Sequence, residues 1–402
     1  MASILEARMN LNLRQQVVLF ANVLQDELFP VLEAQIGKLD GNAQRLVATL
    51  EMIPLARFVP SSRGWIGRPS KDRLAVARAF VAKAVYGLAL TRQLLDRLQQ
   101  DAQLRQICGW SSAEKVPHES TFSRAFAEFA QMELPQFVHE ALIRETQGDR
   151  LIGHVARDST AIEARERFPE TSDKPSAGEP ATPPKAKRKR GSKKGKRGAN
   201  KRHKGGKPKA SLPDDTRLAR QREMKLGEML AELPRECNIG VKTSSKGYTQ
   251  SWRGYKLHLD VADGQIPISA VLTSASLHDS QVAIPLATMS SQRVTYLYAL
   301  MDSAYDAGHI REQSRAMGHV PIIDPKQVRQ KETPFQPGPS RELSPAEKAR
   351  YRERTMIERV HGRLKDEFGG REIRVRGAAK VMAHLMFGIL ALTVDQILKL
   401  VR

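Results

Sequence analysis

The stretch YRERTMIERVHGRLK, Tyr351 to Lys365, separates polar from apolar residues at helical spacing. At 3.6 residues per turn, Tyr351, Arg354, Glu358 and Lys365 fall within an arc of about 60°. The apolar residues share a different sector of the helix: Met356, Ile357, Val360, Leu364 and Phe368. The pattern predicts a helix that packs against a core and shows a polar stripe about 21 Å long. Such a stripe is either a solvated face with ion pairs between successive turns or part of a functional site.

Composition limits the kinds of partner. The chain has 402 residues, of which 41% are hydrophobic, so two or three domains with cores are expected. The formal net charge of +21 indicates a polyanionic partner, either nucleic acid or an anionic membrane surface. Cys108 and Cys237 show neither zinc-site spacing nor a disulfide framework, which fits a reducing interior. The N-terminal residues do not predict a signal peptide.

Residues 1–145 are expected to form a helical N-terminal domain. LRQQVVLFANVLQDELFPVLEAQI and KDRLAVARAFVAKAVYGL both carry apolar residues at helical spacing. A further helix is predicted in HESTFSRAFAEFAQ, with Ser120 and Thr121 as candidate N-caps. Two helices around a turn at this point are typical of a helix-turn-helix, with Arg124 as a candidate DNA contact. A plain helical bundle has the same pattern, so both interpretations stay open.

A strongly basic segment follows, within an insertion expected at about residues 170–212. Lys185 to Lys209 contains 14 Lys and Arg and no acidic residue, which is two thirds of the net charge of +21. It has no apolar residue larger than Ala and is expected to be disordered when free. The segment is either a solubilising tract or a site for DNA phosphates without sequence preference. The candidate phosphate contacts are Lys187, Arg188, Lys189, Arg190, Lys193 and Lys194.

Residues 146–402 alternate between strand and helix patterns. A strand in LIGHVARDST is expected to end at Asp158, and a hairpin is expected around Asp263-Gly264. Val294 to Met301 predicts a strand with Asp302 at its end, and GHVPIID predicts a further short strand. The order indicates a mixed α/β domain with helices packed against a sheet. The first and fourth strands must lie side by side for the two aspartates to meet.

The apolar run VMAHLMFGILALTV, Val381 to Val394, lies near the end of the chain. It is too short to span a bilayer, so a buried C-terminal helix is predicted. A membrane-surface protein would also explain the basic charge, but no amphipathic anchor accompanies it. DNA is therefore the expected polyanion, without a membrane partner.

Three acidic residues stand out by position: Asp158 and Asp302 at predicted strand ends, and Glu358 in the polar stripe. Carboxylates from separate elements can share a pair of Mg²⁺ ions, which prefer oxygen ligands. Two such ions about 4 Å apart stabilise the attacking and leaving oxygens of a phosphoryl displacement. A single aspartate at a strand end is more often a turn or cap residue, so only the combination carries weight.

The chain resembles the bacterial insertion-sequence DDE transposases with a ribonuclease-H-like catalytic domain. Tyr351, Arg354, Glu358 and Lys365 match the signature Tyr-x2-Arg-x3-Glu-x6-Lys of one branch of that family. The resemblance extends to ARDSTAIEA and ALMDSAYDAG as the blocks that carry the two aspartates, and to RGYKLHL and ASLHDSQ between them. GRPSKDRLAVARAFVAKAVYGLALTRQLLDRL and HESTFSRAF are similar to the helical region that precedes this domain in relatives.

This resemblance implies the roles of the residues. Asp158, Asp302 and Glu358 would be catalytic and would bind two Mg²⁺ or Mn²⁺ ions, while Tyr351, Arg354 and Lys365 would hold DNA phosphates. The enzyme would bind double-stranded DNA at terminal inverted repeats, cleave it, and join the 3′ ends to target DNA, as a homodimer. It would act in the bacterial cytoplasm, at the nucleoid. A catalytically idle DNA-binding relative and a related metal-dependent nuclease are the alternatives; intact acids at all three positions argue against decay.

Overall fold

The computed structural model describes residues 13–59, 72–166, 216–243, 248–325 and 342–400. The lysine-rich segment, with Lys187, Arg188, Lys189, Arg190, Lys193 and Lys194, lies outside the described residues. The expectation of an insertion at about 170–212 falls on the same part of the chain.

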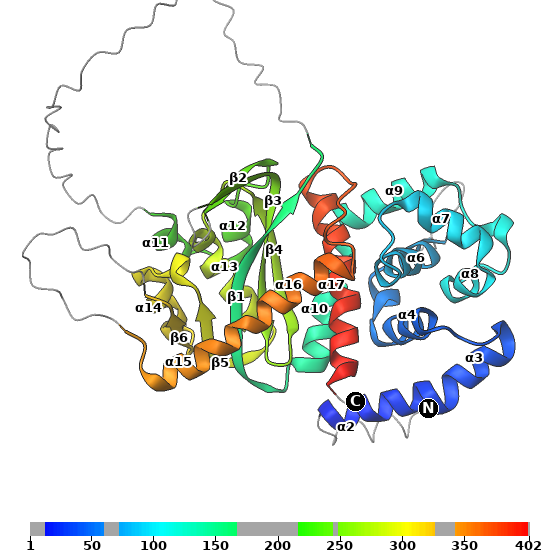
Figure 1. The fold of residues 1–402 in the computed structure, drawn as a ribbon, viewed down its shortest axis with the longest axis horizontal. Helices are drawn as coiled ribbons and strands as arrows, with labels where there is room; N and C mark the ends of the chain where they lie inside the picture. Colours follow the sequence, from blue (N-terminus) through cyan, green and yellow to red (C-terminus); the bar gives the residue numbers. More distant parts are fainter. Residues whose placement is uncertain (1–12, 60–71, 167–215, 244–247, 326–341, 401–402) are drawn as a thin grey trace, which may run out of the picture.

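Helices make up the described chain before residue 150 (Figure 1). They are α2 (Leu13–Asn22), the π-helical η1 (Val23–Leu28), α3 (Phe29–Ile36), α4 (Gly41–Met52), α5 (Leu55–Phe58), α6 (Arg73–Val85), α7 (Thr91–Gln100), α8 (Ala102–Cys108), η2 (Ala113–Lys115), α9 (Glu119–Gln131) and α10 (Leu134–Gln147). Helix α6 is buried along most of its length because small and apolar residues occupy nearly every position. The predicted helical N-terminal region is confirmed.

A mixed six-stranded sheet follows. Its strands are β1 (Leu151–Glu163), β2 (Asn238–Thr243), β3 (Thr249–Ala262), β4 (Ile266–Ser274), β5 (Thr295–Met301) and β6 (Val320–Ile323). The order is β2-β3-β1-β5-β6. Strand β4 also pairs with β3, along residues 255–262, whereas β2 pairs with residues 249–254. Strand β3 is antiparallel to β1, β2 and β4, whereas β1, β5 and β6 run parallel. The mixed α/β expectation and the adjacency of the first and fourth predicted strands are both confirmed.

Helices cover both faces of this sheet. The remaining helical elements are α11 (Arg217–Gln221), α12 (Leu226–Ala231), η3 (Asp279–Val282), α13 (Ala283–Ser291), η4 (Ser303–Tyr305), α14 (Gly308–Ala316), α15 (Pro345–Tyr351), η5 (Arg352–Arg354), α16 (Thr355–Asp366) and α17 (Ala378–Lys399). On one face, Leu257 and Leu259 of β3 join the core that contains Ile357 of α16. On the other face, Val155 and Met301 pack with Ile284 of α13. Alternate side chains of each strand thus enter separate cores.

Helix α17 joins the sheet to the N-terminal helices. It contacts β4 of the sheet and the helices α4, α6, α9 and α10 (Figure 1). Among the described residues, α17 is the helix long and apolar enough to cross a membrane, and 83% of its most apolar window is buried inside the protein. The structure therefore uses it as a core helix, which confirms the prediction of a buried C-terminal helix.

A buried ion pair holds the centre of the sheet. Arg157 of β1 donates from Nε to Asp260 Oδ1 at 2.8 Å and from Nη2 to Asp260 Oδ2 at 2.7 Å. Ser290 of α13 donates to the same Asp260 Oδ2 at 2.6 Å, and Arg157 Nη1 lies 3.7 Å from the sulfur of Met301. Both members of the pair are at most 2% exposed. This two-bond ion pair, here called the fork, and its contacts with Ser290 and Met301 link β1, β3, β5 and α13.

Several boundaries differ from the sequence predictions. Asp158 does not end its strand, because β1 continues to Glu163 and pairs with β3 over that length. The N-cap of α9 is neither Ser120 nor Thr121 but His118, whose Nδ1 accepts from the Ser120 backbone N–H at 3.3 Å. An imidazole fills the place of the usual hydroxyl or carboxylate cap.

Other elements were missing from the sequence predictions. Strand β2 is short and sits at an edge, where Ile239 and Val241 are exposed, so it lacks the apolar pattern of a buried strand. The segment from Tyr351 to Lys365 is also not one uniform helix. A 3₁₀ turn, η5, separates α15 from α16 and tightens the chain between Tyr351 and Arg354.

The buried fork generates a stability prediction. We expect Asp260→Asn to lower the free energy of unfolding by about 3–5 kcal/mol, because the Arg157 charge would stay buried without its partner. Glu312→Gln is the control, since its pair with Arg222 at 2.8 Å is solvent-exposed and should contribute at most about 1 kcal/mol. Urea denaturation measures both. A loss below about 1 kcal/mol for Asp260→Asn would contradict the role given to the fork.

Candidate active site

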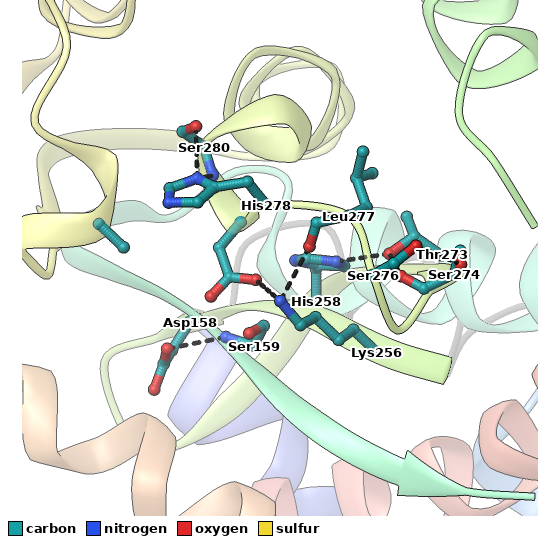
Figure 2. Close-up of polar contacts among 12 residues, drawn as sticks. Asp158, Ser159, Lys256, His258, Thr273, Ser274, Ser276, Leu277, His278 and Ser280 are labelled. Carbon is teal, nitrogen blue, oxygen red and sulfur yellow. Dashed lines mark hydrogen bonds and ion pairs between the residues drawn. The ribbon is translucent and has the colours of Figure 1, made fainter. Parts of the chain in front are cut away.

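The parallel pairing of β1 and β5 brings two aspartates together. Arg157 pairs with Met301 in the register, so Asp158 and Asp302 are the next residues on neighbouring strands. Asp158 Oδ1 accepts a hydrogen bond from the Ser159 backbone N–H at 2.8 Å (Figure 2). Asp302 follows β5 directly and caps η4, where its Oδ1 accepts from the Ala304 N–H at 2.9 Å.

The third acid is linked to this pair by an arginine. Arg354 Nη2 donates to Glu358 Oε1 at 2.9 Å, and Arg354 Nη1 lies 3.5 Å from Asp158 Oδ2. The side chain of Glu358 is 57% exposed, whereas those of Arg354 and Asp158 are mostly shielded. One guanidinium therefore joins the acid of β1 to the acid of α16. Without DNA, Arg354 thus contacts two of the acids, and the phosphate contact that the resemblance implies for it stays a prediction.

Both aspartates are held in an unfavourable environment for negative charge. Burial raises the pKa of Asp158 to about 6, and the nearby Asp302 charge adds to the increase, although Ser159 and Arg354 oppose it. Burial also raises the pKa of Asp302 above its ordinary value. The positive charge of Arg354 thus does not fully offset the effect of burial on the two pKa values.

Tyr351, Lys365 and Lys242 occupy three different positions relative to the acids. The ring of Tyr351 is half-buried, and the Arg354 guanidinium carbon lies 5.8 Å from its centre. Lys365 is half-buried on α16, and burial followed by the charge of Arg371 lowers its pKa. Lys242 of β2 is exposed, and its charge lowers the pKa values of both aspartates. Sequence reasoning missed Lys242 because β2 itself was not predicted.

The other carboxylates of the segment are placed differently. Glu353 is exposed, and Glu367 Oε2 pairs with Arg363 at 2.9 Å, which lowers the pKa of Glu367. Glu358 is the one of the three that shares Arg354 with Asp158. Helix α9 lies on the far side of α17 from the sheet (Figure 1). Arg124 is exposed on α9, and its Nε donates to the Ser120 carbonyl at 3.1 Å.

The carboxylates of Asp158, Asp302 and Glu358 are the kind of ligand that a hard divalent cation prefers, but they do not converge on one point. Within the described residues, no three His, Cys, Asp or Glu side chains are grouped closely enough to hold a metal ion. Asp158 and Asp302 nevertheless supply neighbouring carboxylates. The guanidinium of Arg354 lies between Asp158 and Glu358 and contacts both. Oxygen ligands of this kind suit Mg²⁺ or Mn²⁺, so release of Arg354 from the acids is the change that would complete such a site.

Comparison with known families is consistent with this geometry. Residues 34–128 match the family described as Transposase domain (DUF772), and residues 230–394 match the Transposase DDE domain. The second match contains Asp302 and Glu358, and Asp158 precedes it. No curated protein and no solved structure matches the chain.

Sheet, flanking helices and family matches together define a ribonuclease-H-like domain preceded by a helical transposase region. The chain belongs to the DDE transposases of insertion sequences.

The raised pKa of Asp158 generates a pH-dependent prediction. A carboxyl group whose pKa is higher in the folded than in the unfolded protein destabilises the fold as the pH rises between the two values, here from 3.8 to about 6. We expect Asp158→Asn to increase the free energy of unfolding at pH 8 by about 1–3 kcal/mol. The gain should fall toward zero as the pH is lowered through 6 toward 4. Urea denaturation across this range measures it.

Glu353→Gln is the control for this prediction, since Glu353 is exposed and should show no such gain. An Asp158→Asn variant that is less stable than the native protein at pH 8, or a gain that does not change with pH, would contradict the account of the charge balance.

Proposed function

We propose that the protein is a divalent-metal-dependent transposase that binds the terminal inverted repeats of its insertion sequence, cleaves the DNA at the ends and joins the 3′ ends to target DNA. The observation that carries the proposal is the convergence of three acids from separate elements: Asp158 beside Asp302 through strand pairing, and Glu358 through Arg354. The match to the Transposase DDE domain supports the reaction class.

Asp158, Asp302 and Glu358 are the proposed ligands of two Mg²⁺ or Mn²⁺ ions. When bound, the ions would activate the attacking water or 3′-hydroxyl and stabilise charge at phosphorus. The chain supplies one carboxylate from β1, one directly after β5 and one from α16, which sets their relative orientation. Because Asp158 and Asp302 are partly desolvated, their attraction for a cation exceeds that of exposed carboxylates.

Four side chains around the acids are proposed to bind DNA phosphates: Tyr351, Arg354, Lys365 and Lys242. Arg354 has a double role in this proposal. It pairs with Asp158 and Glu358 without DNA, and a phosphate near the scissile bond offers its guanidinium a competing bidentate partner. Substrate binding would thereby free the acids as it adds negative charge. The charge of Lys242 is one of those that lower the pKa of Lys365, after burial and the charge of Arg371.

Further parts of the proposal concern the rest of the chain. Residues 1–145 are assigned to recognition of transposon ends, with Arg124 as a candidate contact, and residues 146–402 to catalysis. The basic segment is assigned to phosphate contacts that do not depend on sequence. Two copies would act together on paired DNA ends, in the bacterial cytoplasm at the nucleoid.

The helix that carries Glu358 provides its own controls for a test. We expect Glu358→Gln to reduce strand cleavage about 1,000-fold or more, because a proposed metal ligand is lost. Glu353→Gln and Glu367→Gln should each reduce it less than about tenfold, since neither contacts the other acids. Cleavage of DNA carrying the flanking inverted repeats, measured with and without Mg²⁺, provides the comparison.

Binding of the same DNA should survive in the Glu358→Gln variant, which separates chemistry from recognition. If Glu358→Gln cleaves at nearly the native rate in Mg²⁺, the polar stripe is a solvated surface and the proposed role of Glu358 is wrong.

A further inference from the structure

A cavity of about 370 Å³ lies between the N-terminal helices and the C-terminal part of the chain. Its wall includes residues of α6, α9 and α17, the start of α7, and part of the segment 368–375 that follows α16. None of Asp158, Asp302 and Glu358 lines it. Small-molecule sites in proteins commonly have volumes of about 300–1,000 Å³. The cavity is therefore separate from the proposed active site and large enough for a small ligand.

Lys83 of α6 lines this cavity and is only 7% exposed. Within the described part of the chain, its ammonium has no hydrogen bond and no ion pair. Burial lowers the pKa of Lys83 to about 8, and no described acid raises it again. Burial, followed by the charge of Lys83, also lowers the pKa of His384, another lining residue, to about 4. A buried charge without a partner is costly, and an anion in the cavity would supply the partner.

Other parts of the wall are positive as well. Arg92 and Arg374 line the cavity, although Arg374 also pairs with Glu372, and Glu119 is the one acidic side chain among the described lining residues. Helix α7 begins at the cavity, and the preceding Leu90 offers no side-chain acceptor to its first N–H groups. The N-terminus of a helix carries partial positive charge. These groups add to the preference of the wall for a negatively charged ligand.

The remainder of the wall is apolar and largely aromatic. The ring centres of Phe80 and Phe126 are 4.8 Å apart, and those of Phe80 and Phe387 are 5.8 Å apart. All three rings line the cavity, together with Phe368 and Leu88. An inorganic anion would leave this surface without a partner. The wall therefore suits an organic anion with an aromatic or other apolar body.

Two simpler explanations account for less of the arrangement. A lysine can lay its stem along apolar surface and hold its ammonium in water, but the lowered pKa of Lys83 indicates that its ammonium is poorly hydrated. A phosphate of duplex DNA is the other available anion. Such phosphates are contacted by side chains at the protein surface, whereas Lys83 is almost fully buried. A small molecule that enters the cavity meets both objections.

We propose that the cavity binds a small organic anion, with its phosphate, carboxylate or sulfonate group beside Lys83 and its apolar body against Phe80 and Phe387. The ligand would contact both the N-terminal helices and the segment between α16 and α17. The inference does not depend on the proposed function, since none of the three acids takes part in it.

Two fluorescent probes that differ in charge test the proposal on the full-length protein. Anilinonaphthalene sulfonate carries a sulfonate, and phenylnaphthylamine has the same rings without it. We expect Lys83→Met to weaken binding of the sulfonate at least about tenfold, because a charged partner is lost. Binding of the neutral probe should change less than about threefold. The variant loses an unpaired buried charge and keeps a side chain of similar length, so it should fold, which thermal unfolding checks.

Lys115→Met is the matched control, since it removes the same charge from η2, where Lys115 is exposed and donates to Ser111 Oγ at 2.8 Å. It should bind both probes like the native protein. Lys83→Gln is a second variant that should show the same selective loss as Lys83→Met. The inference is wrong if the folded Lys83 variants bind the sulfonate within about threefold of the native protein. Equal loss of both probes would also overturn it, because Lys83 would then shape the cavity without pairing with an anion.

Discussion

The buried fork between Arg157 and Asp260 is the constraint on which the rest of the site depends. It sits on the face of the sheet covered by α13, where Ser290 completes its hydrogen bonds. Because successive residues of a strand point to opposite faces, burial of Arg157 on that side directs Asp158 to the other side. A shift of one residue in the register would exchange the two and place Asp158 in the wrong core.

The electrostatics of the site show a balance between stability and function. Burial of Asp158 and Asp302 raises both pKa values, so the fold carries negative charge in an unfavourable place. Arg354 offsets part of this charge by contacting Asp158 and Glu358. A site that already held a complete counter-charge would have little affinity for metal or DNA phosphate. Under the proposed function, incomplete neutralisation by Arg354 would leave the acids able to attract a metal ion once the guanidinium is displaced.

The parts of the fold that follow from local pattern could be predicted. The hairpin at Asp263-Gly264 forms as its turn residues indicate, with Gly264 at φ 80°, and the apolar face of α16 is buried as its spacing requires. The strand before Asp302 and the burial of α17 likewise follow from composition. These features depend on residues close in sequence, for which propensity and periodicity carry most of the information.

Features that depend on distant pairing were not predicted. From sequence alone, a charged residue such as Arg157 is expected at the surface. Its burial follows only from its pairing with Asp260 on another strand. Strand β3 extends past the residues that pair with β4, and β2 forms by pairing with that extension. This pairing positions Lys242 of β2. Arg354 contacts Asp158 from the 3₁₀ turn η5, an irregularity that a uniform helical wheel does not represent.

The central claim is that acids from β1, the end of β5 and α16 surround one metal site. Replacement of Mg²⁺ by Fe²⁺ in the complex with inverted-repeat DNA, followed by ascorbate and peroxide, produces hydroxyl radicals that cut the polypeptide near the bound iron. Mass spectrometry of the fragments locates the cuts. The account predicts cuts around residues 158, 302 and 358 that disappear together in Asp302→Asn. Cuts confined to other parts of the chain, or an unchanged pattern in Asp302→Asn, would contradict it.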